Sequence, residues 1–206
     1  MTQLPKGLIQ KHMFPAFVTP IVNYVWPEHE KINTQLYEML KNQAECERGL
    51  ARSNVGGWHS SLDFFDCDDE LVQELKKKIQ AFTQELLAEF YPPDALPSFR
   101  MEAWANVLGF GAYNTVHTHP NAAWSGIYYV TANEAVAEHS FSGKLELIDP
   151  RVAANFTYAD QSSLYGRFLL SPVAGQMIMF PAWLQHQVHP YFGKGLRVSI
   201  AVNIIL

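Results

Sequence analysis

Two stretches in the first half of the chain carry apolar residues at spacings of three and four. The first stretch follows Pro27 and stops before Gly49; its apolar positions are Ile32, Leu36, Met39, Leu40 and Ala44. The second follows an acidic run that ends at Glu70 and stops at Pro92; its apolar positions are Leu71, Leu75, Ile79, Phe82, Leu86 and Phe90. This spacing predicts two amphipathic helices, and acidic residues at the start of a helix are favoured by its dipole.

The pattern changes after Leu96, where apolar and polar residues alternate as they do in strands. Turn residues separate the apolar runs. The predicted strands are 99–107, 115–119, 124–131, 144–148, 166–169, 176–180 and 196–205. One further short strand is predicted within Met13–Val25, where two prolines limit it to an edge or a bulge.

Two helices followed by at least seven short strands predict helices packed outside a closed or sandwiched antiparallel sheet. The length of 206 residues suits a single domain, with a strand and the helices in residues 1–96 and the β core in residues 97–206. The polar segment Ser53–Ser61 is expected to be a loop. It is either a surface loop anchored by Trp58 or a lid that contacts the substrate.

Composition narrows the function classes. The net charge of −5 makes nucleic acid an unlikely partner. Cys46 and Cys67 form no CxxC pair, which indicates free thiols in a reducing compartment. No apolar run resembles a signal peptide or a membrane span, so a cytoplasmic protein is expected.

Three histidines are the candidate metal ligands. His117 and His119 are two residues apart in a predicted strand, so their side chains would share one face. His186 follows the predicted buried strand 176–180, and a core strand is a rigid support for a ligand. Iron(II) in oxygenases takes three protein ligands on one face and leaves other positions open.

Arg197 and Ser199 are the candidate co-substrate residues. Open positions on iron can hold a 2-oxo acid, whose distal carboxylate then needs a cation. Arg197 follows the turn Gly193–Gly195, and an antiparallel return would place it beside the strand that carries His186. Arginine binds a carboxylate through two hydrogen bonds and stays charged, and Ser199 would add a hydroxyl on the same face.

Four segments carry a resemblance to a known superfamily: Trp104–Val130, Ser142–Arg151, Pro172–Pro190 and Leu196–Ile204. The chain resembles the 2-oxoglutarate and iron(II)-dependent oxygenases, in their prolyl-hydroxylase-like branch, and is similar to a family of bacterial and phage proteins placed among them. The resemblance implies a double-stranded β-helix, the jelly roll of the cupins, with the two helices outside. It also implies iron(II) as the metal and 2-oxoglutarate as the co-substrate.

The same resemblance implies roles for particular residues. His186 would be the distal iron ligand, and Arg197 and Ser199 would hold 2-oxoglutarate. Tyr128 or Tyr129 would touch the co-substrate. The expected activity is that of a dioxygenase, which couples oxidative decarboxylation of 2-oxoglutarate to hydroxylation of a substrate.

The first ligand motif departs from the superfamily pattern. The usual motif is H-x-D or H-x-E, but here His117-Thr118-His119 is followed by Asn121 and no carboxylate. The site could be three histidines, two histidines with waters, or a pairing of His119 with Asn121; we favour His117 with His119. The alternatives in function are a three-histidine cupin-type metalloenzyme that does not use 2-oxoglutarate, and a non-catalytic binding protein. The substrate, a small molecule or a peptide, is not indicated, and N-terminal edge strands could pair in a homodimer.

Overall fold

The computed structural model describes residue 11 and residues 16–152, 154 and 166–206. The first three residues of the predicted strand Met13–Val25 lie outside that set, and within it only β1 (Val22–Val25) is a strand. β1 lies at the edge of its sheet, as its prolines predicted.

The predicted helices and strands are largely confirmed, with bounds that differ by a few residues. The helices are α2 (Glu30–Cys46) and α3 (Glu70–Ala88), with short 3-10 turns η1 (Phe64–Asp66) and η2 (Pro93–Ala95). The strands of the second half are β4 (Arg100–Leu108), β5 (Tyr113–His117), β6 (Trp124–Tyr129), β7 (Leu145–Ile148), β8 (Arg167–Leu170), β9 (Gln176–Pro181), β10 (His186–Val188) and β11 (Arg197–Ile205).

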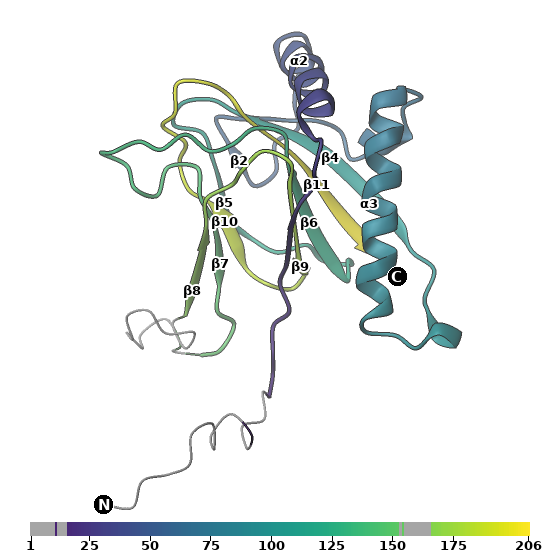
Figure 1. The fold of residues 1–206 in the computed structure, drawn as a ribbon. Coiled ribbons are helices and arrows are strands. Elements are labelled where there is room, and N and C mark those ends of the chain that lie inside the picture. The colour runs from purple at the N-terminus through teal and green to yellow at the C-terminus, as the bar shows by residue number, and fades with distance from the viewer. Residues whose placement is uncertain (1–10, 12–15, 153, 155–165) are drawn as a thin grey trace, which may run out of the picture.

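The strands form two antiparallel sheets that face each other. The major sheet has the order β1-β9-β6-β11-β4-β3, and the minor sheet has the order β2-β5-β10-β7-β8. From β4 to β7 and from β8 to β11, each strand lies in the sheet opposite to the one before it, which is the winding of a double-stranded β-helix. Both helices lie on the outer side of the major sheet (Figure 1).

Strand β9 of the major sheet is apolar on both faces because each face packs against a different core. Met177 and Met179 of β9 pack toward the helices, whereas Ile178 and Phe180 pack between the sheets. This is why residues 176–180 are a continuous apolar run and not an alternating one.

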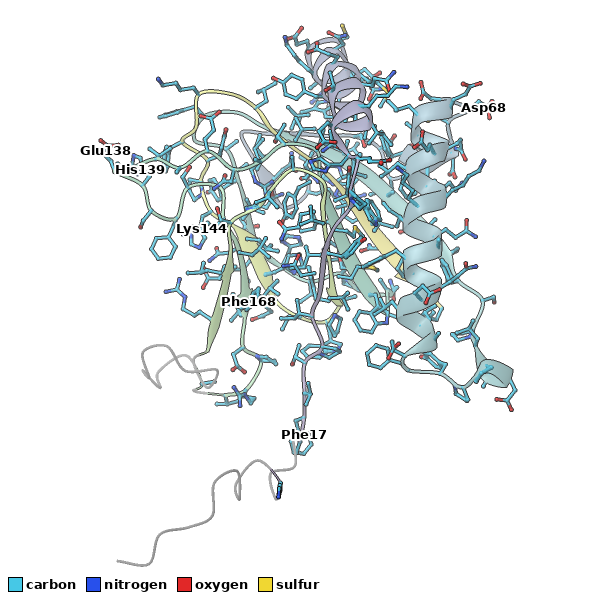
Figure 2. All side chains as sticks on the ribbon, viewed as in Figure 1. Phe17, Asp68, Glu138, His139, Lys144 and Phe168 are labelled. Carbon is cyan, nitrogen blue, oxygen red and sulfur yellow. The ribbon has the colours of Figure 1, made fainter. Side chains whose placement is uncertain are left out.

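The start of α3 follows from its sequence. Oδ1 of Asp69 accepts hydrogen bonds from the backbone N–H groups of Leu71 and Val72, so the acidic run, with Asp68 beside it, caps the helix (Figure 2). The predicted apolar stripe is correct except at Phe90, which lies beyond the helix end, is half exposed and contacts Trp124.

The segment predicted as a loop, Ser53–Ser61, contains two short strands. β2 (Asn54–Val55) pairs with β5 of the minor sheet, and β3 (Trp58–His59) pairs with β4 of the major sheet. Gly56 and Gly57 make the crossing between them; Gly56 has a φ of 71°, and a Cβ on Gly57 would lie 2.4 Å from Leu108 Cδ2. We call residues 54–59 the strap, because they join the two sheets along one side.

None of the described helices is both long enough and apolar enough to cross a membrane.

Candidate active site

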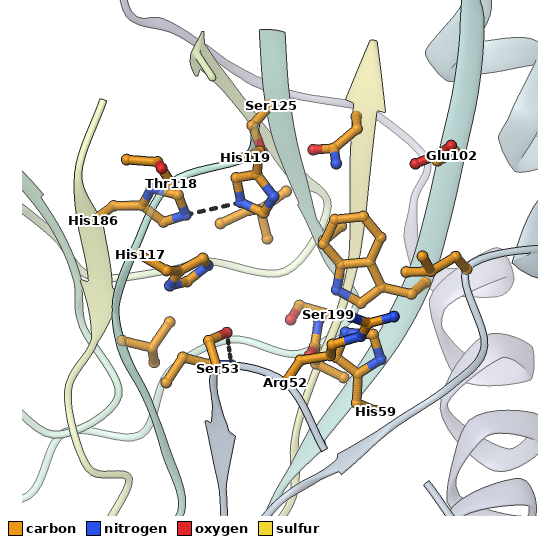
Figure 3. Close-up of a pocket in the computed structure, with 18 of the residues that line it drawn as sticks. Arg52, Ser53, His59, Glu102, His117, Thr118, His119, Ser125, His186 and Ser199 are labelled. Carbon is orange, nitrogen blue, oxygen red and sulfur yellow. Dashed lines mark hydrogen bonds between the residues drawn. The ribbon is translucent and has the colours of Figure 1, made fainter. Parts of the chain in front are cut away.

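A cavity of about 540 Å³ lies between the two sheets. The minor-sheet side contributes His117, His119 and His186, and the major sheet contributes Arg197 and Ser199. Figure 3 shows the three histidines gathered on one side of the cavity, with Ser199 and His59 on another. The structure therefore brings all five predicted polar and metal-binding residues to one space.

Two of the histidines face each other across neighbouring strands. His117 ends β5 and His186 begins β10, and the two residues are directly paired in register. His186 therefore belongs to a strand of its own that the sequence did not predict. His119 lies two residues beyond the end of β5, so the prediction that it is inside that strand is wrong. Its backbone N–H donates to Ala182 O at 3.0 Å, which holds the segment next to the end of β9.

The three imidazoles converge. One ring nitrogen from each lies within 4.8 Å of the others, and Nε2 of His119 lies 3.2 Å from Nε2 of His186. Nδ1 of His117 donates to Thr115 O at 2.7 Å, and Nδ1 of His186 donates to Leu184 O at 2.9 Å. A carbonyl oxygen can only accept, so both Nδ1 atoms carry the proton and both Nε2 atoms present a lone pair. Backbone carbonyls commonly orient metal-binding histidines in this way.

Burial keeps these histidines neutral. Desolvation lowers the pKa of His186 to about 3 and that of His119 to about 4, and it also lowers the pKa of His117. A metal ligand must be unprotonated, so protons do not compete for these nitrogens near pH 7. Among the described residues, no carboxylate joins this cluster, and Asn121 lies exposed in the turn after Pro120 with a φ of 68°. The arrangement favours His119 over Asn121.

Arg197 does not lie beside the strand of His186, contrary to the prediction. β11 pairs with β4 and β6 in the major sheet, whereas β10 belongs to the minor sheet. The error came from assuming that consecutive strands pair, whereas in this winding they lie in opposite sheets. Arg197 therefore faces the histidines across the cavity, which leaves room for a molecule between them.

The guanidinium of Arg197 is almost completely buried and only partly bonded. Its Nε donates to Gly143 O at 3.1 Å, Nη1 lies 3.5 Å from Ser199 Oγ, and Nη2 has no hydrogen-bond partner among the described residues. Its Cζ lies 5.3 Å from the ring centre of Tyr129, whose buried hydroxyl is also unpartnered. Burial raises the pKa of Tyr129 to about 12, so its hydroxyl keeps its proton near pH 7. Burial lowers the pKa of Arg197, but a guanidinium starts from so high a pKa that it remains charged in proteins. The unpartnered Nη2 of this buried cation and the unpartnered hydroxyl of Tyr129 are two donors that would suit a carboxylate.

The two candidate tyrosines point in opposite directions. Tyr128 packs in the core between the major sheet and the helices, where its hydroxyl donates to Asn33 Oδ1 of α2 at 2.5 Å. Tyr129 packs between the two sheets beside Arg197. Of the two, only Tyr129 is placed to touch a co-substrate held by Arg197.

Comparisons with known proteins agree with this geometry. Residues 102–203, which run from β4 to β11, match the model of a family described as "Putative 2OG-Fe(II) oxygenase". Residues 102–203 belong to this family. The predicted class of enzyme is thereby confirmed: the protein is an oxidoreductase of the 2-oxoglutarate- and iron(II)-dependent kind. A search of curated proteins found no match.

Solved structures of similar proteins share the fold of the oxygenase. A Pseudomonas putida prolyl-4-hydroxylase has 17% identity and a TM-score of 0.65, with 90% of this chain and 91% of that chain covered. A Trichoplax adhaerens prolyl hydroxylase, solved with a peptide of hypoxia inducible factor, has 14% identity and a TM-score of 0.58, with 91% and 83% covered. HygX from Streptomyces hygroscopicus, solved with nickel, 2-oxoglutarate and hygromycin B, has 10% identity and a TM-score of 0.62, with 90% and 82% covered. The predicted double-stranded β-helix is confirmed.

Some cavity residues of the oxygenase were not predicted from its sequence. Trp104 and Asn106 alternate with the other residues of β4 along the sequence, and both are buried and line the cavity. His59 of the strap is also buried and lines it. Asn106 could have been identified by its register, because it pairs directly with Ser199 of the neighbouring strand β11.

Two acidic residues that could have replaced the missing carboxylate ligand lie elsewhere in the oxygenase. Glu146 binds Arg167 Nε at 2.6 Å, His189 Nε2 at 2.6 Å and Gln187 Nε2 at 2.9 Å. Asp149 pairs with Arg151. Glu146 therefore ties β7 to its neighbours β8 and β10.

Replacing Glu146 by glutamine is expected to lower the free energy of unfolding by about 2 kcal/mol at pH 7, since charged hydrogen bonds are lost from a buried site. Burial alone would raise the pKa of Glu146, but its three hydrogen bonds lower it to about 2 from 4.5. A lowered carboxyl pKa stabilises the fold above pH 4.5, and this stabilisation is lost as the pH falls through 2.

Urea unfolding of both proteins at several pH values checks this. The difference between wild type and Glu146→Gln should be largest above pH 4.5 and shrink toward pH 2. A difference that does not vary with pH would contradict the assignment. Glu74→Gln, at the exposed ion pair with Lys78, is the matched control and should change the free energy of unfolding by well under 1 kcal/mol.

Proposed function

We propose that His117, His119 and His186 hold the iron(II) of this oxygenase, and that Arg197 binds the distal carboxylate of 2-oxoglutarate. Ser199 and Tyr129 would donate their hydroxyl groups to the same carboxylate. The observation that carries this proposal is the orphaned Nη2 of Arg197, buried in the wall of the cavity that also holds three convergent histidines.

The two alternative functions are less well supported. A three-histidine cupin-type metalloenzyme matches the ligand set, but it has no need for a buried arginine whose donor is unpaired. A non-catalytic binding protein on the same scaffold would be favoured by an occluded pocket, whereas this cavity measures about 540 Å³.

Each part of the cavity has a role in this function. Iron(II) supplies the redox chemistry that couples oxidative decarboxylation of 2-oxoglutarate to hydroxylation of a C–H bond. The Nδ1 bonds of His117 and His186 hold their rings so that the Nε2 lone pairs converge. Arg197 and Tyr129 fix the far end of the co-substrate, and the apolar residues between the sheets keep water away from that end.

We further propose that residues 1–206 act as one domain in the cytoplasm, on a small molecule or a peptide. Both substrate classes are compatible with the fold, since one similar structure contains a peptide and another contains hygromycin B. The edge strand β1 is the candidate surface for a homodimer, because it ends its sheet.

The test is an anaerobic titration of the purified protein with iron(II) and then 2-oxoglutarate. A weak visible charge-transfer band is expected when both are bound, and iron-dependent formation of succinate is expected when oxygen is admitted. A protein that binds iron but gives neither band nor succinate would contradict the proposal and favour the three-histidine enzyme.

A further inference from the structure

His59 is a buried histidine in the cavity wall that the proposed iron and 2-oxoglutarate sites do not use. Its side chain lies on β3 of the strap and only 3% of the residue is exposed. The imidazole stacks on the indole of Trp104 with ring centres 5.5 Å apart and an angle of 6° between planes. Trp104 in turn contacts the ring of His119, at 5.5 Å between centres. His59 thus lies one aromatic ring away from the metal cluster.

The tautomer of His59 follows from one hydrogen bond. Nδ1 lies 2.6 Å from Ser60 O and must donate to it, because a carbonyl oxygen only accepts. Burial is the main cause that lowers the pKa of His59, so the ring is neutral near pH 7. Nε2 therefore carries a lone pair, and it forms no hydrogen bond with any other described residue. This atom is an unused acceptor in the lining of the cavity (Figure 3).

The strap holds His59 rigidly. The carbonyl of His59 accepts from Leu50 N at 2.8 Å, and the next residue, Ser60, donates its N–H to Ala105 O at 3.0 Å. Trp58 Nε1 donates to Glu47 O at 3.1 Å. A side chain fixed in this way can orient a ligand with little further loss of conformational entropy.

The chemistry of Nε2 excludes the co-substrate as its partner. The groups that suit a dicarboxylate are donors, and they lie on β11 and β6: Arg197, Ser199 and Tyr129. His59 occupies the same cross-strand row as Asn106 and Ser199, but at the edge of the sheet, two strands away from β11. Arg52 is a cation in the same part of the cavity lining (Figure 3), but the lone pair of Nε2 itself repels a carboxylate oxygen and attracts an N–H or O–H group.

We propose that His59 binds the primary substrate, accepting at Nε2 a hydrogen bond from an amide N–H or a hydroxyl group. The strap is then the part of the cavity wall that selects substrates with such a donor, and Trp104 is the flat surface on which His59 is held. This inference rests on the proposed function, because it takes the histidine cluster and Arg197 as the sites of the other two reactants.

The experiment uses the anaerobic protein with iron(II) and 2-oxoglutarate, whose charge-transfer band reports changes beside the metal. Three probes are titrated to tens of millimolar: N-acetyl-L-alaninamide as an amide donor, methyl glucoside as a hydroxyl donor, and the dimethylamide of N-acetyl-N-methyl-L-alanine, which has no N–H group. The variants are His59→Ala and His59→Gln, the second of which keeps an acceptor. His139→Ala is the matched control, since His139 is exposed on a loop outside the cavity (Figure 2).

At least one donor probe is expected to perturb the band of the wild type, and the more effective one identifies the source of the donor. The dimethylamide should bind at least 10-fold more weakly than the alaninamide if the donor is an amide. The perturbing probe should bind at least 10-fold more weakly to His59→Ala, and within about 3-fold of wild type to His59→Gln and His139→Ala. The affinity for 2-oxoglutarate should stay within about 2-fold in every variant.

Three results would overturn the inference. The first is that no donor probe perturbs the band of the wild type. The second is that a perturbing probe binds His59→Ala as tightly as it binds the wild type. The third is that His59→Ala weakens 2-oxoglutarate binding 10-fold or more. Failure of the proposed function looks different, because the wild type would then show no charge-transfer band before any probe is added.

Discussion

Arg197→Ala is expected to weaken 2-oxoglutarate binding at least 100-fold while leaving the metal site intact. In the wild type the bound carboxylate would complete the hydrogen bonds of a buried guanidinium whose Nη2 has no partner among the described residues. A charge-assisted pair of hydrogen bonds contributes about 3 kcal/mol, and each 1.4 kcal/mol corresponds to a factor of about 10 in affinity. The measurement is titration of the anaerobic iron(II) protein with 2-oxoglutarate, followed by the charge-transfer band.

Two further variants distinguish a loss of 2-oxoglutarate binding from a loss of folding. Arg197→Lys keeps a charge but loses the fork of donors, so an intermediate affinity is expected. Arg151→Ala removes an exposed arginine paired with Asp149 and should bind 2-oxoglutarate as the wild type does. If Arg197→Ala unfolds in urea like the wild type and still binds 2-oxoglutarate with unchanged affinity, the proposed co-substrate site is wrong.

The fold was predictable because its elements depend on local patterns. The apolar spacing of α2 and α3 and the alternation in β4 and β11 are properties of each segment alone. The pairing of the strands could not be predicted from these local patterns. β9 and β11 look like consecutive neighbours in sequence, but β10 crosses to the other sheet between them and β6 separates them in space.

Site residues that belong to a recognisable sequence motif could be predicted, whereas site residues that only the tertiary structure brings to the cavity could not. His117, His186 and Arg197 could be named because their residue types and spacing match a known chemistry. His59 could not, since its two-residue strand is formed by pairing with β4 and not by its own β-propensity. Asn106 could not be placed either, because alternation shows that the two faces of a strand differ in polarity and does not show which face is outside; the structure buries Asn106. In a barrel that holds ligands, the polar face can be the inner one.

His119 decides how the metal is held, and replacing it tests the choices that the sequence left open. His119→Ala is expected to lower the affinity for iron(II) about 100-fold, as are His117→Ala and His186→Ala, because each removes one of three convergent nitrogens. His119→Asp should bind iron(II) at least as tightly as the wild type, since a carboxylate offsets a unit of the metal's charge that a neutral imidazole does not. Equilibrium competition with a chromophoric chelator under anaerobic conditions measures the iron(II) affinities of the wild type and the four variants.

The pattern of losses separates the possible ligand sets. If His119→Ala binds iron(II) as the wild type does while the other two alanine variants lose it, the metal is held by His117 and His186 with waters. If Asn121→Ala loses iron(II) instead, this exposed turn residue, which also lines the cavity, completes the metal site. Loss in the three histidine variants alone, with Asn121→Ala and His139→Ala unchanged, establishes a three-histidine site. Such a site has a net charge one unit more positive than a site with a carboxylate ligand, which should tighten its hold on the anionic 2-oxoglutarate.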